Sequence, residues 1–324
     1  MTKITASLFT IIVPGLLLAT APARAQLSRT FVSAATGVDS GNCDRPTPCR
    51  TFQFAHDNTL ANGEITVLDP GSYGSVNINR AISIINDGVG EAGALVSGGT
   101  GSVGIYIAAP NDAAVTLRGL TIKGLGPDWP GGKGIYFATG ASLTVENCVI
   151  RNLTDPNAGV GIAFVPNGST GRLTVSNTLI TDNGGPGIDV FPIGAASATN
   201  VVLDRVGLYN NYVGLWVDGA GTTGSIVATV VNSTAAGNSG RGFYAKSAGA
   251  KAVTTIVLDR SVSAGNGVGI QADLAQVMLD RSVVTGNTTT LQASGANSIL
   301  SYRDNQIDLN LDGQPGVITQ VFHR

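Results

Sequence analysis

An internal repeat constrains the fold of this chain more than any other feature. A glycine followed by a large apolar residue recurs at intervals of 30, 27, 26, 27, 28 and 27 residues, at Gly104, Gly134, Gly161, Gly187, Gly214, Gly242 and Gly269. Each unit adds two more short apolar segments and closes on an asparagine turn, at Asn183, Asn211, Asn238, Asn266 or Asn287. Short strands with period-two alternation, joined by Gly and Asn turns, predict a parallel β-solenoid with one repeat per turn.

The composition disfavours the alternatives to a solenoid. The chain has 44 glycines in 324 residues, and a glycine in a helix interior costs about 1 kcal/mol relative to alanine. Disorder needs a high net charge and few apolar residues, whereas this chain has a formal net charge of −2 and 43% hydrophobic residues. Because nucleic-acid partners require basic patches, we expect no nucleic-acid partner.

Two rungs carry a resemblance to a known group of proteins. The segments GIYFATGASLTVENCVIRN and GIAFVPNGSTGRLTVSNTLITDN resemble right-handed parallel β-helix repeats of the pectate-lyase-like superfamily, and Ile65–Tyr73 resembles its first coil. The resemblance covers roughly residues 30 to 315 and implies an all-β, single-stranded right-handed parallel β-helix of about 8–10 rungs. It implies no single chemistry, because the superfamily includes lyases, hydrolases, epimerases, phage tailspikes and adhesins.

The expected organisation has four parts. Residues 1–25 have the features of a signal peptide, residues 26–64 form an N-terminal strand, a disulfide loop and a capping helix, residues 65–316 form the β-helix, and residues 317–324 are a tail. The apolar run of the leader is shorter than the about 20 residues that cross a bilayer. We therefore expect an exported protein, periplasmic or extracellular, with no membrane span.

The three cysteines fit an exported protein, because an oxidising compartment permits disulfides. Cys43 and Cys49 flank a short Pro-rich loop and are expected to be bridged; the alternative is two unpaired surface thiols. Cys148 is expected to be a small buried side chain.

A solenoid end exposes unpaired backbone groups and has to be covered. The best candidate is a capping helix over Thr51–Ala61, with apolar residues on one side at Phe52, Ala55 and Leu60.

Strand alternation predicts one outward column of side chains suited to binding a ligand. The first and third residues after each repeating glycine are apolar and line the interior, so the second faces outward. Down the rungs this column reads Tyr106, Tyr136, Ala163, Asp189, Trp216, Tyr244 and Gln271. Amphipathic rings suit the apolar faces of sugars, which makes Tyr106, Tyr136, Trp216, Tyr244 and Gln271 candidate substrate-binding residues.

The alternative is that these rings stack on one another or lie beneath a loop and only stabilise the fold. The second strand of each unit provides a comparison. Its outward residues include no aromatic or charged side chain and are expected to be structural: Thr116, Thr144, Thr174, Val202, Thr229, Val257 and Met278.

Asp189, Asp218, Lys246 and Asp273 are the candidate catalytic residues on the same face. Strand geometry places the Cα atoms of Asp189 and Asp218 about 8 Å apart, and inverting glycosidases hold their carboxyl groups about 6.5–9.5 Å apart. Lys246 lies between Asp218 and Asp273 and is a candidate base for lyase chemistry. The alternative is a row of alternating charges on a solvated surface, which contributes little to the stability of the fold.

The sequence predicts no cofactor and no metal site. Gly184–Phe191 fits a calcium-binding nonapeptide pattern once, but the tandem repeats of that motif are absent, so Ca²⁺ is only a weak candidate. The chain also lacks the Gly-His-Gly of polygalacturonase-like enzymes. Leu215–Gly219 is similar to the Trp-Ile-Asp-His segment of pectate lyases without its histidine.

The main functional hypothesis is an exported β-helix that binds a polysaccharide along this aromatic and acidic face and, in its stronger form, cleaves it as a lyase or glycosidase. The alternative is a non-catalytic structural or adhesive solenoid of the cell surface or periplasm. A third hypothesis is an envelope solenoid with a protein partner.

Overall fold

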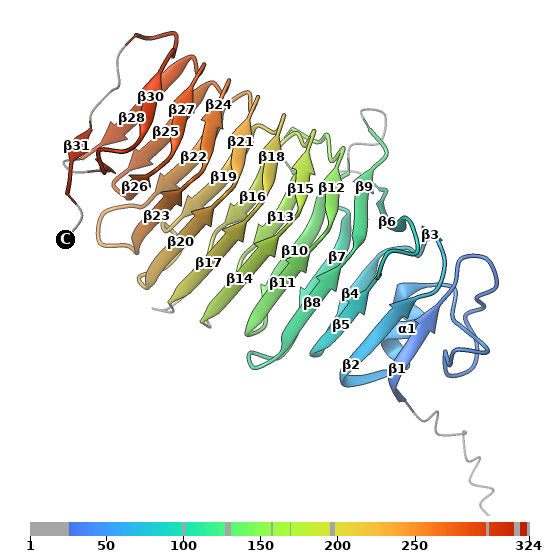
Figure 1. Cartoon of the computed structure of the whole chain (residues 1–324). Coiled ribbons are helices and arrows are strands. Elements are labelled where there is room, and N and C mark those ends of the chain that lie inside the picture. The colour runs from blue at the N-terminus through green and yellow to red at the C-terminus, as the bar shows by residue number, and fades with distance from the viewer. Residues whose placement is uncertain are drawn as a thin grey trace, which may run out of the picture.

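The chain folds into a parallel β-helix with three long sheets (Figure 1). The computed structural model describes residues 26–98, 101–126, 131–156, 158–168, 170–194, 198–295, 298–313 and 318–322. The predicted signal peptide, residues 1–25, lies outside these ranges. Every strand pair is parallel, and each sheet takes one strand from each successive rung, which confirms the solenoid predicted from the repeat.

The three sheets are named A, B and C. Sheet A contains β1 (Leu27–Val32), β2 (Thr59–Val67), β5 (Ile82–Ile85), β8 (Ala114–Arg118), β11 (Ser142–Glu146), β14 (Gly171–Ser176), β17 (Thr199–Asp204), β20 (Ser225–Val231), β23 (Val253–Asp259), β26 (Gln276–Asp280), β29 (Ile299–Ser301) and β31 (Thr319–Gln320). Sheet B contains β3 (Gly71–Ser72), β6 (Ala92–Val96), β9 (Leu120–Gly124), β12 (Val149–Arg151), β15 (Leu179–Thr181), β18 (Gly207–Tyr209), β21 (Thr234–Ala236), β24 (Val262–Ala264), β27 (Val283–Thr285) and β30 (Gln306–Asp308). Sheet C contains β4 (Val76–Ile78), β7 (Val103–Ala108), β10 (Lys133–Thr139), β13 (Val160–Phe164), β16 (Pro186–Val190), β19 (Val213–Asp218), β22 (Arg241–Lys246), β25 (Val268–Asp273) and β28 (Thr289–Ser294).

The repeating glycines of sheet C point into the core. A Cβ atom built on Gly161 would lie 2.4 Å from the carbonyl oxygen of Gly187 and 2.6 Å from Cγ2 of Ile180, an inward residue of sheet B. The same crowding, with a contact under 3.0 Å, occurs at Gly104, Gly134, Gly187, Gly214, Gly242 and Gly269. The repeat therefore needs glycine because no side chain fits between sheets B and C at this point.

A buried asparagine ladder stabilises the turn between sheets B and C. Nδ2 of each asparagine donates to Oδ1 of the next, at distances of 2.8–3.3 Å, through Asn183, Asn211, Asn238, Asn266, Asn287 and Asn310. The first five were recognised in the sequence as turn residues, and the ladder extends one rung further to Asn310. Because these amides are nearly all satisfied within the stack, they can be buried at little cost.

The N-terminal end is covered by a disulfide loop and a short helix. Cys43 and Cys49 form the predicted disulfide, and Cys148 is buried, as expected. Helix α1 (Phe52–Asp57) starts after the capping residue Thr51 but ends four residues before Ala61. The prediction was wrong at Leu60, which is exposed and lies in β2, because pairing with β1 and β5 starts the strand at Thr59.

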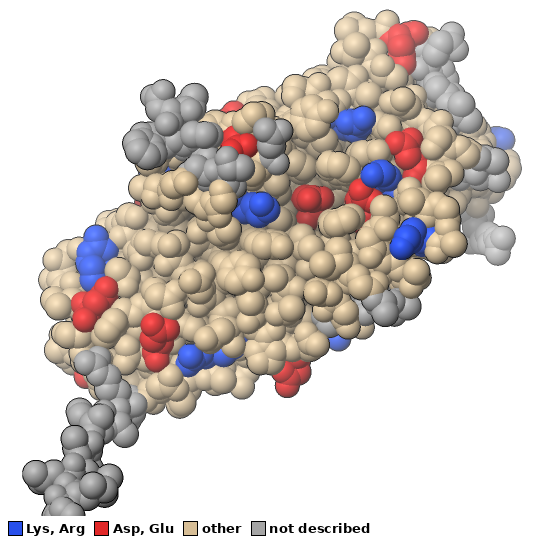
Figure 2. All heavy atoms as spheres, turned by 180° about the vertical axis from the view of Figure 1, so that it is seen from behind, with Lys and Arg blue, Asp and Glu red and all other residues tan. Residues whose placement is uncertain are grey.

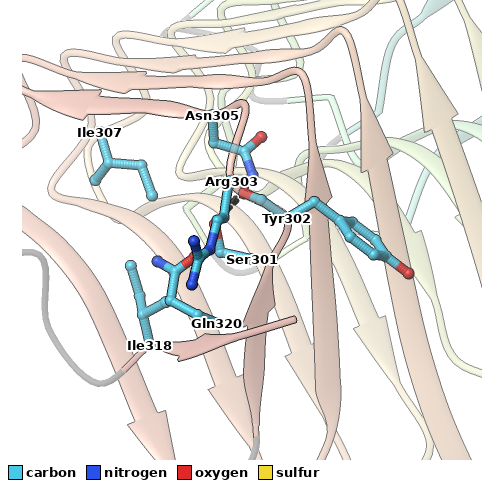
Figure 3. Close-up of a pocket in the computed structure, with 7 residues that line it drawn as sticks. All are labelled: Ser301, Tyr302, Arg303, Asn305, Ile307, Ile318 and Gln320. Carbon is cyan, nitrogen blue, oxygen red and sulfur yellow. Dashed lines mark hydrogen bonds between the residues drawn. The ribbon is translucent and has the colours of Figure 1, made fainter. Parts of the chain in front are cut away.

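The C-terminal end carries a surface hollow of about 680 Å³. Figure 3 shows Ser301, Arg303 and Gln320 gathered beside Asn305, whose amide donates to Oγ of Ser301 at 3.0 Å, while the ring of Tyr302 points away. Strand β31 pairs with β29 and so extends sheet A past the last complete rung.

Acidification is expected to weaken the N-terminal end through His56. This side chain is fully buried, and burial, reinforced by Arg80, lowers its pKa below the ordinary 6.5, although its bond to Asp57 opposes the shift. The unfolded chain therefore binds a proton more readily, so stability falls as the pH drops below about 6.5. Urea unfolding at pH 8 and pH 5.5 should show a larger loss for the wild type than for His56→Gln. An equal loss in both proteins would contradict this role.

Candidate functional site

The outward column of sheet C has the register predicted from the sequence. Each residue of the column pairs with the next one on the neighbouring strand, in the order Tyr106, Tyr136, Ala163, Asp189, Trp216, Tyr244 and Gln271. The column extends to Asn77 at one end and to Gln292 at the other. The comparison column on sheet A also faces outward, through Thr116, Thr144, Thr174, Val202, Thr229, Val257 and Met278.

The exposure of the sheet C column differs from the prediction at three positions. Tyr106, Tyr136 and Trp216 are half-buried and keep part of their surface in solvent. In contrast, Ala163 is only 2% exposed, and the candidate substrate-binding residues Tyr244 and Gln271 are only 7% and 4% exposed. The expectation that these two residues offer free surface to a substrate was therefore wrong, because neighbouring polar side chains bind them and lie against them.

Two ring pairs lie on this face. The ring centroids of Tyr106 and Tyr136 are 5.5 Å apart, and those of Trp216 and Tyr244 are 5.4 Å apart. Both separations are within the range of favourable aromatic contacts. The pairs are separated by the two rungs that carry Ala163 and Asp189.

Two cations beside these rings were missed in the sequence. Nζ of Lys133 lies 5.7 Å from the ring centroid of Tyr136, and the guanidinium of Arg241 lies 4.7 Å from that of Tyr244. Each residue directly precedes a repeating glycine. Because that glycine and the next residue both point inward, the residue before the glycine faces outward, which strict alternation does not predict.

A hydrogen-bonded network covers Tyr244. Its hydroxyl donates to Oδ2 of Asp273 at 2.8 Å, and Nε2 of Gln271 donates to the same oxygen at 2.8 Å. Nε of Arg241 donates to Oε1 of Gln271, and Ser294 donates to the other oxygen of Asp273 at 3.3 Å. The carboxylate of Asp273, predicted to be catalytic, is thus held by three donors.

A second carboxylate is held by an ion pair. Nζ of Lys246 lies 3.1 Å from Oδ2 of Asp218, which is buried, and the backbone N–H of Ala220 donates to Oδ1 at 2.9 Å. The same ammonium lies 5.9 Å from the ring centroid of Trp216. Asp218, Lys246 and Asp273 are therefore adjacent, as the sequence predicted, and Lys246 pairs with Asp218.

Asp189 has a different environment from the other two carboxylates. Removal from water raises its pKa to about 7, the negative charge of Asp218 adds to this effect, and Lys133 opposes it. Within the described part of the chain, no hydrogen bond to its side chain is present. A carboxyl group with a pKa near neutrality can both donate and accept a proton at physiological pH.

The next rung carries an unpaired donor. Nε1 of Trp216 is buried, and no acceptor for it is found among the described residues. Buried indole N–H groups are usually hydrogen-bonded, so Trp216 is an exception among the described residues. Trp216 is the direct strand neighbour of Asp189.

The wider charge distribution is mixed. On the face drawn in Figure 2, acidic and basic side chains lie in small groups, and no large area carries one sign of charge. No group of three His, Cys, Asp or Glu side chains within the described ranges is arranged to hold a metal ion. In the same ranges, no helix is long and apolar enough to cross a membrane.

Comparison with protein families identifies the repeat. The family described as right handed beta helix region matches residues 53–202 and 103–274. This chain belongs to the right-handed β-helix family. The match confirms the right-handed β-helix repeat that the sequence predicted. A search of curated proteins gives no match.

Two solved structures, XylC and pectate lyase Pel9A, share this fold at low sequence identity. XylC in complex with xylose has a TM-score of 0.56 and 9% identity, over 91% of this chain and 71% of that chain. Pectate lyase Pel9A has a TM-score of 0.50 and 16% identity, over 85% and 80%. The A-module of the Azotobacter vinelandii mannuronan C-5 epimerase AlgE4 has a TM-score of 0.47 and 17% identity, over 74% and 72%.

Proposed function

We propose that this β-helix binds a polysaccharide along the outer face of sheet C. The observation that carries the proposal is the pair of ring clusters, Tyr106–Tyr136 and Trp216–Tyr244, on either side of Asp189. Four rungs separate Tyr106 from Trp216, the last ring with surface in solvent, a span of about 19 Å at the spacing of neighbouring strands. This length suits several sugar units of an extended chain.

The polar groups on the same face fit a hydroxylated ligand. The carboxyl group of Asp189 has no hydrogen bond to a described residue, and a sugar hydroxyl can donate a hydrogen bond to it. The names of two structural relatives, a pectate lyase and a protein bound to xylose, also support a carbohydrate ligand.

We further propose that Asp189 transfers a proton if the bound chain is cleaved. Among the four candidate catalytic residues, it alone combines a pKa near 7 with a side chain free of hydrogen bonds in the described structure. Asp218, paired with Lys246, would act as a fixed charge about 8 Å away by strand geometry. Asp273, held by three donors, would position Tyr244 and Gln271.

The proposal also includes export. The disulfide between Cys43 and Cys49 supports an oxidising location, since such bonds are rare in the cytosol. The signal peptide expected at residues 1–25 remains a prediction.

The second candidate function is a structural or adhesive solenoid. It is favoured by the burial of Tyr244 and Gln271, whose contacts are made within the protein. In this case the Trp216–Tyr244 pair would only stabilise the stack, as aromatic pairs do by about 0.5–1.5 kcal/mol.

Affinity electrophoresis through gels that contain a panel of neutral and acidic polysaccharides tests the binding proposal. We expect at least one polysaccharide to retard the wild type and Tyr136→Ala to weaken this retention by about tenfold, the effect of losing roughly 1.4 kcal/mol. Tyr212→Ala is the matched control, because Tyr212 is an exposed tyrosine that precedes β19 and lies outside the column. Equal retention of both variants, or no retention by any polysaccharide, would favour the structural alternative.

A further inference from the structure

A separate hollow lies on the outer surface of sheet B, near the N-terminal end. Its volume is about 550 Å³, within the range of about 300–1,000 Å³ that is typical of small-molecule sites. The residues that define it belong to β6, β9 and the segments beside them: Pro70, Glu91, Gly93, Leu95, Lys123 and Leu125. We call it the sheet B hollow.

The floor of the hollow contains a glycine that the fold does not require. Gly93 has no positive φ, and it pairs in continuous register with Ser72 on one side and Thr121 on the other. A Cβ atom at Gly93 would meet its nearest neighbour at 3.4 Å, an ordinary contact. Glycine inside a strand usually marks a bulge, a tight bend or the close approach of a ligand or another backbone, and the first two are excluded here.

Among the glycines of the described strands, only Gly93 could carry a Cβ atom without a contact under 3.0 Å. At each of the others a Cβ atom would come within 3.0 Å of another atom: Gly63, Gly71, Gly104, Gly124, Gly134, Gly161, Gly171, Gly187, Gly207, Gly214, Gly242 and Gly269. Those glycines are explained by packing inside the protein. The absence of a side chain at Gly93 instead leaves the hollow open at its floor.

The lining indicates the chemistry of a ligand. Pro70, Leu95 and Leu125 supply aliphatic walls, and the side chain of Leu125 remains 48% exposed. No aromatic ring lines the hollow, so the usual platform for a sugar is missing. A flat aromatic ring, however, packs well over the peptide groups of a glycine in a sheet, as aromatic side chains do when they cover glycines of neighbouring strands.

The rim of the hollow supplies polar groups at one side. Glu91 and Lys123 form an ion pair with 3.2 Å between Nζ and Oε1, and both side chains remain partly exposed. The carboxylate of Glu91 can accept a hydrogen bond from a group at the edge of a ring. We propose that the sheet B hollow binds an aromatic ring with a hydrogen-bond donor, such as a phenol or an indole.

Saturation-transfer NMR with p-cresol and with N-acetyl-tyrosinamide as probes tests this proposal. We expect p-cresol to bind the wild type. Its affinity for Gly93→Val should be lower by a factor of about ten or more, because the valine side chain fills the floor of the hollow. Thr174→Val, on the outer face of sheet A, is the control and should bind as the wild type does. Binding of N-acetyl-tyrosinamide would assign the ring to a tyrosine of a partner, and binding of p-cresol alone to a free small molecule.

Two results would overturn the proposal. One is the absence of saturation transfer to either probe in the wild type, and the other is equal transfer in the wild type and Gly93→Val. If Gly93→Val does not fold, Leu125→Ser provides the same test at the wall, since Leu125 is exposed and its loss should weaken p-cresol binding without unfolding the chain. Glycan retention depends on sheet C, so this test is independent of the proposed function.

Discussion

Replacement of Gly161 by valine is expected to destabilise the β-helix by about 3 kcal/mol or more, at the upper end of the cost of overpacking. Valine is a favourable residue in an exposed strand, so the loss would come from the interior alone. The new Cβ atom would lie 2.4 Å from the carbonyl oxygen of Gly187 and 2.6 Å from Cγ2 of Ile180. Because one of these atoms belongs to the backbone of the next rung, relief requires the rungs to separate.

Urea unfolding, followed by circular dichroism, measures this effect. Gly93→Val is the matched control, since it makes the same chemical change in a strand where the Cβ atom meets nothing closer than 3.4 Å. We expect Gly161→Val to unfold at a much lower urea concentration and Gly93→Val to unfold near the wild type. Similar midpoints for all three proteins would show that the repeating glycines are not required by packing.

Replacement of Asp189 by asparagine is expected to have two effects of opposite sign. If the bound polysaccharide is cleaved, turnover should fall by a factor of about 10²–10⁴, the usual contribution of a general acid or base. In contrast, the asparagine variant should be more stable than the wild type at pH 8. The carboxyl has a folded-state pKa of about 7, against an ordinary pKa of 3.8 in an unfolded chain, so the unfolded chain ionises first and stability falls as the pH rises between these values.

The asparagine variant lacks this ionisation. We expect it to be more stable than the wild type by about 2 kcal/mol at pH 8, with the difference vanishing near pH 4; the half-buried position of Asp189 and solvent screening keep the figure below the full linkage value. Asp218→Asn is the comparison, because it breaks the ion pair with Lys246 and should destabilise the protein. A stability difference between wild type and Asp189→Asn that is independent of pH would contradict the environment described for Asp189.

Turnover is measured with the same two variants on each polysaccharide that retards the wild type in affinity electrophoresis. The readouts are the release of reducing ends and the absorbance of unsaturated uronates. Unchanged turnover in Asp189→Asn would exclude Asp189 as the proton-transfer group. Absence of turnover on every substrate would leave binding, or the structural alternative, as the function.

Much of the fold was predictable because the same pattern of glycine, apolar and asparagine residues recurs in each rung. The register of the Tyr106 column follows from counting residues after each glycine, and the outward threonines of sheet A follow from period-two alternation. The asparagine ladder was also predictable, since turn asparagines recur at one height.

The details of the site depended on information that alternation does not contain. Lys133 and Arg241 face outward because the glycine after each of them points inward, which places two consecutive residues in the core. The burial of Tyr244 follows from Arg241 lying against its ring. Arg205 adopts a positive φ of 54° at a turn where asparagine is the more usual residue, and only the backbone shows this.

The central claim is that the ring column of sheet C contacts a polysaccharide. Hydroxyl-radical footprinting with mass spectrometry tests it directly, by comparing oxidation rates with and without the polysaccharide that retards the protein most. Slower oxidation of Tyr106, Tyr136 and Trp216 is predicted, with unchanged rates at Tyr212 and at Met278 on the outer face of sheet A. Protection of Met278, or unchanged oxidation of all three column residues, would contradict the claim.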